Sequence, residues 1–123
     1  MNSAIHGRLV RLAQVRRTTT FDEIAAMVGI DARGRLSPSR TMKALSEIST
    51  YEHSRARPML SVIVLHREGR SPGPEFFALA RSLGRYSGDD EASERKFLET
   101  ETQSVWDQWR REASGVPGQP LPG

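Results

Sequence analysis

The chain has no cysteine, only two lysines and no long run of apolar residues among its 123 residues. The lack of cysteine excludes disulfides, thiolate zinc sites and cysteine nucleophiles together. No apolar stretch approaches the roughly 18 to 20 residues that span a bilayer, and residues 1–3 lead directly into an arginine-bearing segment without a signal-peptide core. We therefore expect a soluble cytoplasmic protein, and the length predicts one domain.

Positive charge is concentrated in the first part of the chain. Residues 1–70 carry twelve Lys/Arg and six Asp/Glu, a net charge of +6, whereas residues 71–123 carry six and nine, a net charge of −3. Of the 18 basic residues, all but Lys43 and Lys96 are arginine, whose planar donor fork suits phosphates and guanine edges. A high-GC genome also favours arginine, so the position of the charge is the stronger indication. It coincides with a helical pattern typical of nucleic-acid binding.

Two helices and a short strand are predicted in the first thirty residues. A first helix is expected from Ser3 or Ala4 to Arg17, with an apolar stripe at helical spacing. The β-branched run Thr18–Thr20 favours a short strand that pairs with a later one. Thr20 and Glu23 match a capping box, which opens a second helix that Gly29 ends.

A third helix is expected over residues 38–54, because a serine followed by proline at position 38 is a strong start signal. Its first turns are basic and rich in hydroxyl groups, whereas Glu47 and Glu52 follow in the later turns. Recognition helices contact base edges mainly with their N-terminal residues, and this charge gradient suits that use.

The apolar run Met59–Leu65 predicts a buried strand, and the turn-rich loop 66–74 predicts a wing that carries Arg67 and Arg70. Together with the preceding helices, these elements predict an α+β fold, a winged helix-turn-helix domain with extra C-terminal helices. We expect one domain over residues 1–114 and a disordered Pro/Gly-rich tail over 115–123.

The C-terminal part predicts a short helix near residues 75–84 and a long one from Asp89 to about Ala113. The long helix has a wide apolar face that includes Phe97, Val105, Trp106 and Trp109. This face either packs on the domain or forms a homodimer or protein-partner interface. The two tryptophans are typical of a core, and stacking on bases is the alternative.

Residues that would carry chemistry are scattered. His6, His53 and His66 lie in separate predicted elements without metal-ligand spacing, and the glycines match no nucleotide-binding loop. The carboxylates at residues 89–94 are typical of a solvated helix N-terminus. We therefore predict no enzymatic activity, no cofactor and no metal.

Three segments carry a resemblance to a known family. Arg17–Ala25, the basic helix around Arg40 and Val62–Arg67 resemble the winged-helix domain of alkylguanine-DNA alkyltransferases and alkyltransferase-like proteins. That resemblance implies DNA binding, with Arg40 as the arginine that enters the duplex. The family carries a Pro-Cys-His-Arg segment on a strand. Here Val64 replaces the proline and Leu65 the reactive cysteine, so the resemblance implies no alkyl transfer.

The leading hypothesis is a non-enzymatic winged-helix protein that binds double-stranded DNA in a regulatory or accessory role. Its predicted contacts come from the third helix, the connection before it, the wing, and the end of the first helix: Ser39, Arg40, Lys43, Arg33, Arg35, Arg67, Arg70, Arg16, Arg17 and Thr19. The alternative is a protein–protein interaction module, which Glu47, Glu52 and the acidic C-terminal half favour. Salt dependence separates the two, because phosphate-driven binding weakens steeply as salt rises.

Overall fold

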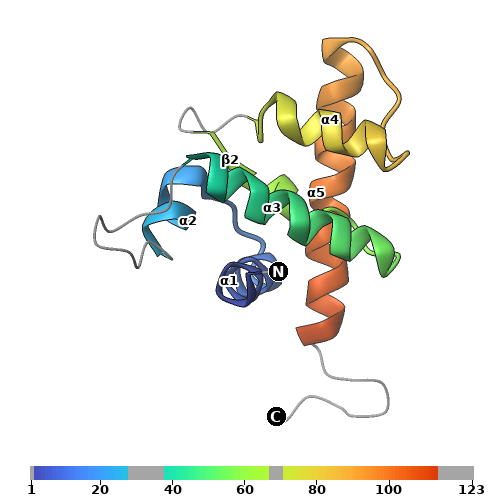
Figure 1. The fold of residues 1–123 in the computed structure, drawn as a ribbon. Helices are drawn as coiled ribbons and strands as arrows, with labels where there is room; N and C mark the ends of the chain where they lie inside the picture. The colour runs from blue at the N-terminus through green and yellow to red at the C-terminus, as the bar shows by residue number, and fades with distance from the viewer. Residues whose placement is uncertain (1, 28–37, 67–70, 114–123) are drawn as a thin grey trace.

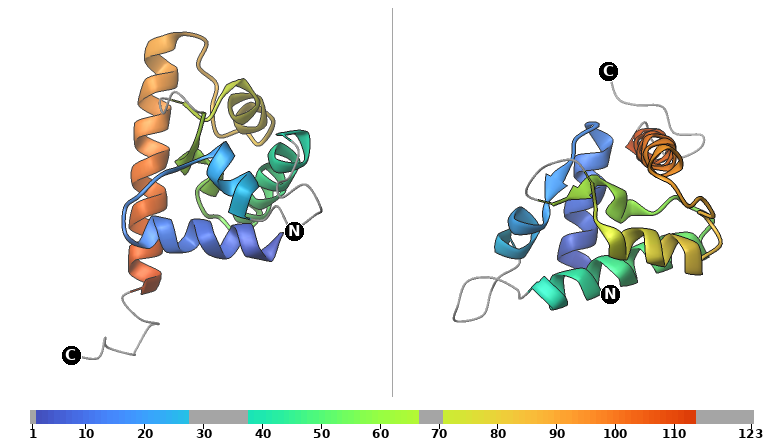
Figure 2. Two further views of the ribbon diagram at one scale, coloured as in Figure 1. Left: turned by 90° about the vertical axis from the view of Figure 1, so that its left-hand side faces the viewer. Right: turned by 90° about the horizontal axis from the view of Figure 1, so that it is seen from above.

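The computed structural model describes residues 2–27, 38–66 and 71–113. Helices dominate this part of the chain, and α5 runs along one side of the molecule (Figure 1; Figure 2, left). None of the described helices is long and apolar enough to cross a membrane. The elements in chain order are α1 (Ser3–Gln14), β1 (Thr19–Thr20), α2 (Phe21–Met27), α3 (Pro38–Ser54), the 3₁₀ helix η1 (Leu60–Ile63), β2 (Val64–Leu65), α4 (Pro74–Ser82) and α5 (Glu91–Ala113).

Local signals set several of these bounds. Thr20 caps α2 as predicted, since the Glu23 N–H donates to Thr20 Oγ1 at 3.1 Å, and the Thr20 hydroxyl donates to Glu23 Oε1 at 3.3 Å. The third helix has the bounds that the sequence predicted. The first ends earlier, at Gln14, because the chain turns through a left-handed conformation at Arg16, with φ of 57°. The predicted end of the second helix, Gly29, lies outside the described residues.

The predicted pairing of the threonine run is confirmed. β1 pairs with β2 in parallel, with Thr19 opposite Val64 and Thr20 opposite Leu65. This pairing brings the start of α2 next to the segment that follows β2.

The prediction of a strand over Met59–Leu65 is wrong for most of its length. Leu60–Ile63 forms a 3₁₀ helix, and only Val64–Leu65 is extended. Every side chain from Met59 to Val64 is buried, so the run lacks the alternation that marks a strand with one solvated face. A continuous apolar run of this length does not distinguish a buried strand from a buried helical turn.

The described sheet is a single parallel pair of two-residue strands. A wing is a loop between two antiparallel strands. At the predicted wing, the described residues show one backbone hydrogen bond across the loop, donated by the His66 N–H to the Ser71 carbonyl oxygen at 2.9 Å. The helical α+β class is therefore observed, and the winged form stays a prediction.

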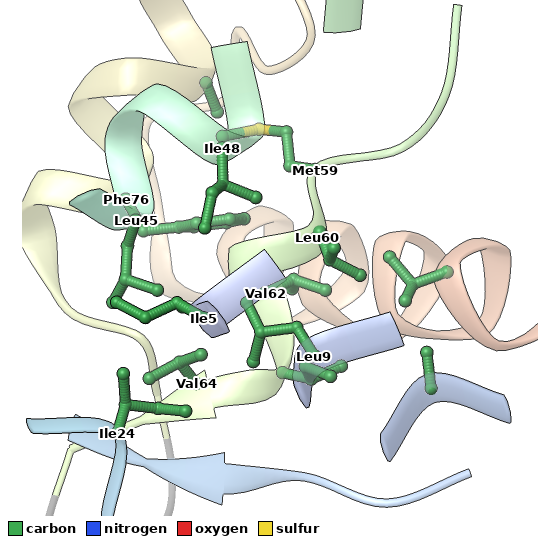
Figure 3. Close-up of a cluster of buried hydrophobic side chains, with 14 of the residues drawn as sticks. Ile5, Leu9, Ile24, Leu45, Ile48, Met59, Leu60, Val62, Val64 and Phe76 are labelled. Carbon is green, nitrogen blue, oxygen red and sulfur yellow. The ribbon is translucent and has the colours of Figure 1, made fainter. Parts of the chain in front are cut away.

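One hydrophobic core draws on every helix and on β2 (Figure 3). Ile5 and Leu9 of α1 meet Leu45 and Ile48 of α3 there, with Leu60 of η1 beside them. Such buried side chains supply most of the favourable free energy of folding.

The apolar face of α5 packs on this core, as one of the two interpretations predicted. Val105 is fully buried and Trp109 is 6% exposed, whereas Phe97 and Trp106 are partly buried against the same core. Val105 and Trp109 are therefore covered by their own chain and are not available to a homodimer or to another protein.

Candidate nucleic-acid interface

The outer face of α3 carries the residues that the sequence analysis placed in a groove. Ser39, Arg40 and Lys43 are exposed, and Glu47 and Thr50 continue the exposed face toward the C-terminal end. The opposite face is buried in the core through Thr41, Ala44, Leu45 and Ile48. The 3.6-residue period of the helix separates these two faces, so the polar face is displayed outward without distortion.

The charge of this face changes along the helix. Arg40 and Lys43 lie near the N-terminal end of α3, where the helix dipole adds a partial positive charge. Glu47 follows one turn later. α2 packs against α3 and has Asp22 and Glu23 exposed in its first turn, so the surroundings of the basic residues are mixed in charge.

His66, the first residue of the segment that was predicted to be a wing, packs on α2. Its ring stacks on Phe21 of α2, with 4.8 Å between the ring centroids and 29° between the planes. Gly73 lies against the same ring, and a Cβ atom at this position would overlap Nε2 of His66. The predicted contacts Arg67 and Arg70 lie outside the described residues.

Arg16 and Arg17 are not brought together with the α3 residues. The Arg16 guanidinium lies 5.4 Å from the centroid of the Trp106 ring, and Trp106 Nε1 lies 3.5 Å from the Arg17 carbonyl oxygen. Arg16 and the Arg17 backbone therefore lie beside α5, and the turn that follows α1 lies at the opposite end of α1 from the start of α3 (Figure 2). Thr19 is 5% exposed and offers little surface to a phosphate. Arg33 and Arg35 lie outside the described residues.

The two tryptophans differ in their surroundings. Trp109 is buried in the core, whereas the partly exposed Trp106 lines an open groove of about 390 Å³ between α5 and the segment around β2. The Arg16 side chain already lies over the Trp106 ring. Of the two tryptophans, only Trp106 is accessible for stacking on a base. The base would have to displace the Arg16 side chain from the Trp106 ring.

Glu52 was counted among the acidic residues that favour a protein-interaction surface, but it does not lie on the surface. Its side chain is fully buried, with Oε2 at 3.6 Å from His6 Nε2 and Oε1 at 3.6 Å from Arg57 Nε. The Arg57 guanidinium also lies 5.1 Å from the Trp109 ring centroid. A signal was available, because position 52 continues the buried row of Thr41, Leu45 and Ile48 at helical spacing.

A second buried carboxylate lies nearby. Glu101 of α5 accepts hydrogen bonds from Arg85 Nε at 2.9 Å and from the Met59 backbone N–H at 2.8 Å. Arg85 Nη1 lies 3.3 Å from Nδ1 of His53. These contacts join α3, η1 and α5, and the compensated charges give the cluster a structural role.

The described residues contain no group of three histidine, aspartate or glutamate side chains positioned to hold a metal ion. No protein-family model, curated protein or solved structure matches this chain. The described part of the chain is a mostly helical α+β domain, and the exposed face of α3 carries Arg40 and Lys43 near its N-terminal end.

Proposed function

We propose that this chain is a non-enzymatic DNA-binding protein that inserts the N-terminal part of α3 into a groove of the duplex. The observation that carries the proposal is the exposed face with Ser39, Arg40 and Lys43 at the start of α3. A helix that reads DNA contacts base edges with these first residues, and arginine is the side chain best suited to guanine. The proposed role is regulatory or accessory in a DNA transaction.

The cationic side chains have two kinds of proposed contact with DNA. Arg40 and Lys43 enter the groove and contact base edges or the phosphates at its rim. Arg67 and Arg70, which lie outside the described residues, contact the DNA backbone from the predicted wing in this proposal. Backbone contacts position the protein on the duplex, and base contacts give it a preference for sequence.

The test is fluorescence anisotropy of a labelled duplex at several salt concentrations. The wild type is compared with an Arg40→Gln/Lys43→Gln variant and with an Arg95→Gln/Lys96→Gln control, which removes the same charge from exposed positions on α5. Glutamine has a helix propensity close to those of arginine and lysine, so the helices are retained.

We expect the α3 variant to bind at least about tenfold more weakly, because each lost phosphate contact lowers the slope of log K against log salt by about 0.9 and each lost base contact costs about 1–3 kcal/mol. The control variant should bind with an affinity close to that of the wild type. Equal loss in the two variants would mean that only net charge matters and that α3 does not enter a groove.

The second candidate is a protein-interaction module that uses the same helix. Tyr51 favours it, because this large side chain is 39% exposed in the later turns of α3 and its ring lies 6.0 Å from the Arg55 guanidinium. Exposed tyrosine and arginine are enriched in protein interfaces. No binding of the wild type to any duplex at low salt would favour this candidate over DNA binding.

A further inference from the structure

A second basic surface lies on α1, away from the α3 residues. Its exposed side carries Arg8 and Arg11, and the exposed Arg16 and Arg17 follow directly after the helix. We call Arg8 and Arg11 the α1 arginine face. No aspartate or glutamate occurs in residues 1–21, so no acidic residue neighbours these arginines in the sequence.

The fold makes no use of the two arginines within the helix. Among residues 2–27, 38–66 and 71–113, the side chains of Arg8 and Arg11 make no hydrogen bond, ion pair or ring contact. Arg85 and Arg110, by contrast, lie near Glu101 and Asp107. Like charges three residues apart on a helix repel each other by a few tenths of a kcal/mol, and the helix dipole favours Arg11 in the last turn by a similar amount.

Gly7 is a second, independent observation on the same face. A glycine inside a helix costs about 1 kcal/mol relative to alanine. A Cβ atom at Gly7 would meet nothing within 4 Å, so packing within the protein does not require the glycine. It lies one turn before Arg11 and leaves the helix backbone open there, which lets a ligand approach the backbone closely.

The α1 arginine face is separate from the α3 site. Ile5 and Leu9 of α1 and Leu45 and Ile48 of α3 point into the same core (Figure 3). The exposed faces of the two helices therefore point away from that core on different sides of the molecule. α1 also runs from below α3 toward α5, which carries Arg16 and Arg17 farther from α3 (Figure 2).

We infer that the α1 arginine face binds the phosphate backbone of a nucleic acid independently of its base sequence. It would be a second contact surface in addition to the one on α3. Because it concerns the same partner, this inference rests on the proposed function. A duplex carries one negative charge per about 1.7 Å of its axis, so a twelve-residue helix about 18 Å long faces several phosphates at once.

An anionic lipid surface is a poorer match. Helices that lie in a membrane interface bury an apolar face in the lipid. The apolar face of α1 is occupied by the core, and Val15, just after the helix, is the large apolar side chain that is exposed here, at 63%. The arginines alone would supply only a weak, salt-sensitive attraction to lipid.

The test compares four proteins in the same anisotropy titration: the wild type, Arg8→Gln/Arg11→Gln, Arg40→Gln/Lys43→Gln and the Arg95→Gln/Lys96→Gln control. Urea unfolding first confirms that all four are folded. Two duplexes of unrelated sequence are titrated at each salt concentration. The α1 variant should lower the salt slope by about 1.8, for two lost phosphate contacts, and weaken binding to both duplexes by the same factor.

Each variant tests one proposal. If the α1 variant retains the salt slope and affinity of the wild type, the inference about α1 is overturned, whatever the α3 variant does. If the α3 variant binds like the wild type while the α1 variant is weakened, the α1 inference holds and the proposed function of α3 fails. If the wild type binds no duplex, both fail.

Vesicles of phosphatidylserine and phosphatidylcholine identify the other anionic partner. Co-sedimentation that is lost in the Arg8→Gln/Arg11→Gln variant, together with unchanged duplex binding, would assign the α1 arginine face to lipid and overturn the inference. No co-sedimentation, together with weakened duplex binding in that variant, supports it.

Discussion

Oε2 of Glu52 lies 3.6 Å from Nε2 of His6, and this approach joins α3 to α1 inside the protein. The Glu52 side chain is fully buried, and the distance is too long for a direct hydrogen bond. Oε1 of the same carboxylate lies 3.6 Å from Nε of Arg57. Glu52 is thus a buried carboxylate whose nearby guanidinium, that of Arg57, supplies charge compensation.

Removing Arg57 alone should lower the free energy of unfolding more than removing both Glu52 and Arg57. We expect Arg57→Met to destabilise the protein by about 3 kcal/mol, because it leaves Glu52 buried with less compensation. A Glu52→Leu/Arg57→Met double variant should recover much of that loss, since apolar residues of similar volume replace a buried ion pair at little cost. Urea unfolding of the two variants measures the difference. A double variant less stable than Arg57→Met would contradict this account.

Alanine at Gly73 should destabilise the protein more than alanine at Gly84. Gly73 has φ of 94° and ψ of 170°, a conformation that is almost exclusive to glycine, and a Cβ atom there would overlap the His66 ring. Gly84 also has a positive φ, of 76°, but a Cβ atom there meets nothing within 4 Å. We expect a loss of about 1 kcal/mol for Gly84→Ala and a larger one for Gly73→Ala.

Thermal unfolding of the two variants gives the comparison, and Gly84→Ala is the control for backbone strain. A His66→Ala change in the Gly73→Ala background should recover part of the difference, because it removes the ring that the new Cβ atom meets. Equal losses at the two glycines would show that the contact with His66 contributes nothing.

Gly7→Ala should stabilise the protein by up to about 1 kcal/mol, because alanine is the better residue inside a helix and the added methyl group has open space. For a chain of this size, that gain raises the midpoint of thermal unfolding by about 4 °C. Calorimetry measures the shift. A lower midpoint would mean that Gly7 has a structural role that its open surroundings do not reveal.

Asp90 should make a pH-dependent contribution at the start of α5. The backbone N–H and the hydroxyl of Ser93 hold the pKa of this exposed carboxyl below its ordinary value of 3.8. Because the folded-state pKa is depressed, the stabilisation is present above the unfolded-state pKa and is lost as pH falls through the folded-state pKa. The stability difference between the wild type and Asp90→Asn should therefore be constant near neutral pH and shrink in acid.

Unfolding in urea at several pH values between 2 and 7 gives this difference directly. Glu91→Gln is a suitable control, since it removes a carboxylate from the adjacent exposed position. The prediction fails if the difference between the wild type and Asp90→Asn grows toward low pH.

Much of the local structure could be predicted because its causes lie within a few residues. The Thr20 hydroxyl accepts from the backbone N–H of Glu23, three residues on, and α3 starts at Pro38, whose fixed φ suits the first position of a helix. The exposed row of Arg40 and Lys43 follows from helical spacing alone. The secondary structure of Met59–Leu65 could not be predicted from the sequence. Every residue from Met59 to Val64 is buried, and such a run has no periodicity that distinguishes a strand from a helical turn.

The candidate site divides in the same way. The exposure of Ser39, Arg40 and Lys43 was predicted, but their separation from Arg16 and Arg17 was not. All five residues lie in the first part of the sequence, which has a net positive charge. A count of charges along the sequence does not show whether they lie on the same surface. The turn at Arg16 and the packing of α1 on α5 place them on different sides of the protein.

The sequence by itself determined most of the helices and the basic start of α3, because capping, spacing and charge are short-range properties of the chain. It predicted that the threonine run pairs with a later strand, but not that the pairing is parallel or that Val64–Leu65 is the partner. Only the tertiary structure decided that Leu60–Ile63 turns instead of extending, that Glu52 is buried beside His6 and Arg57, and that α1 presents arginines on its own side. Each of these three features depends on which side chains pack together in the core. That packing is set by contacts between residues far apart in the sequence.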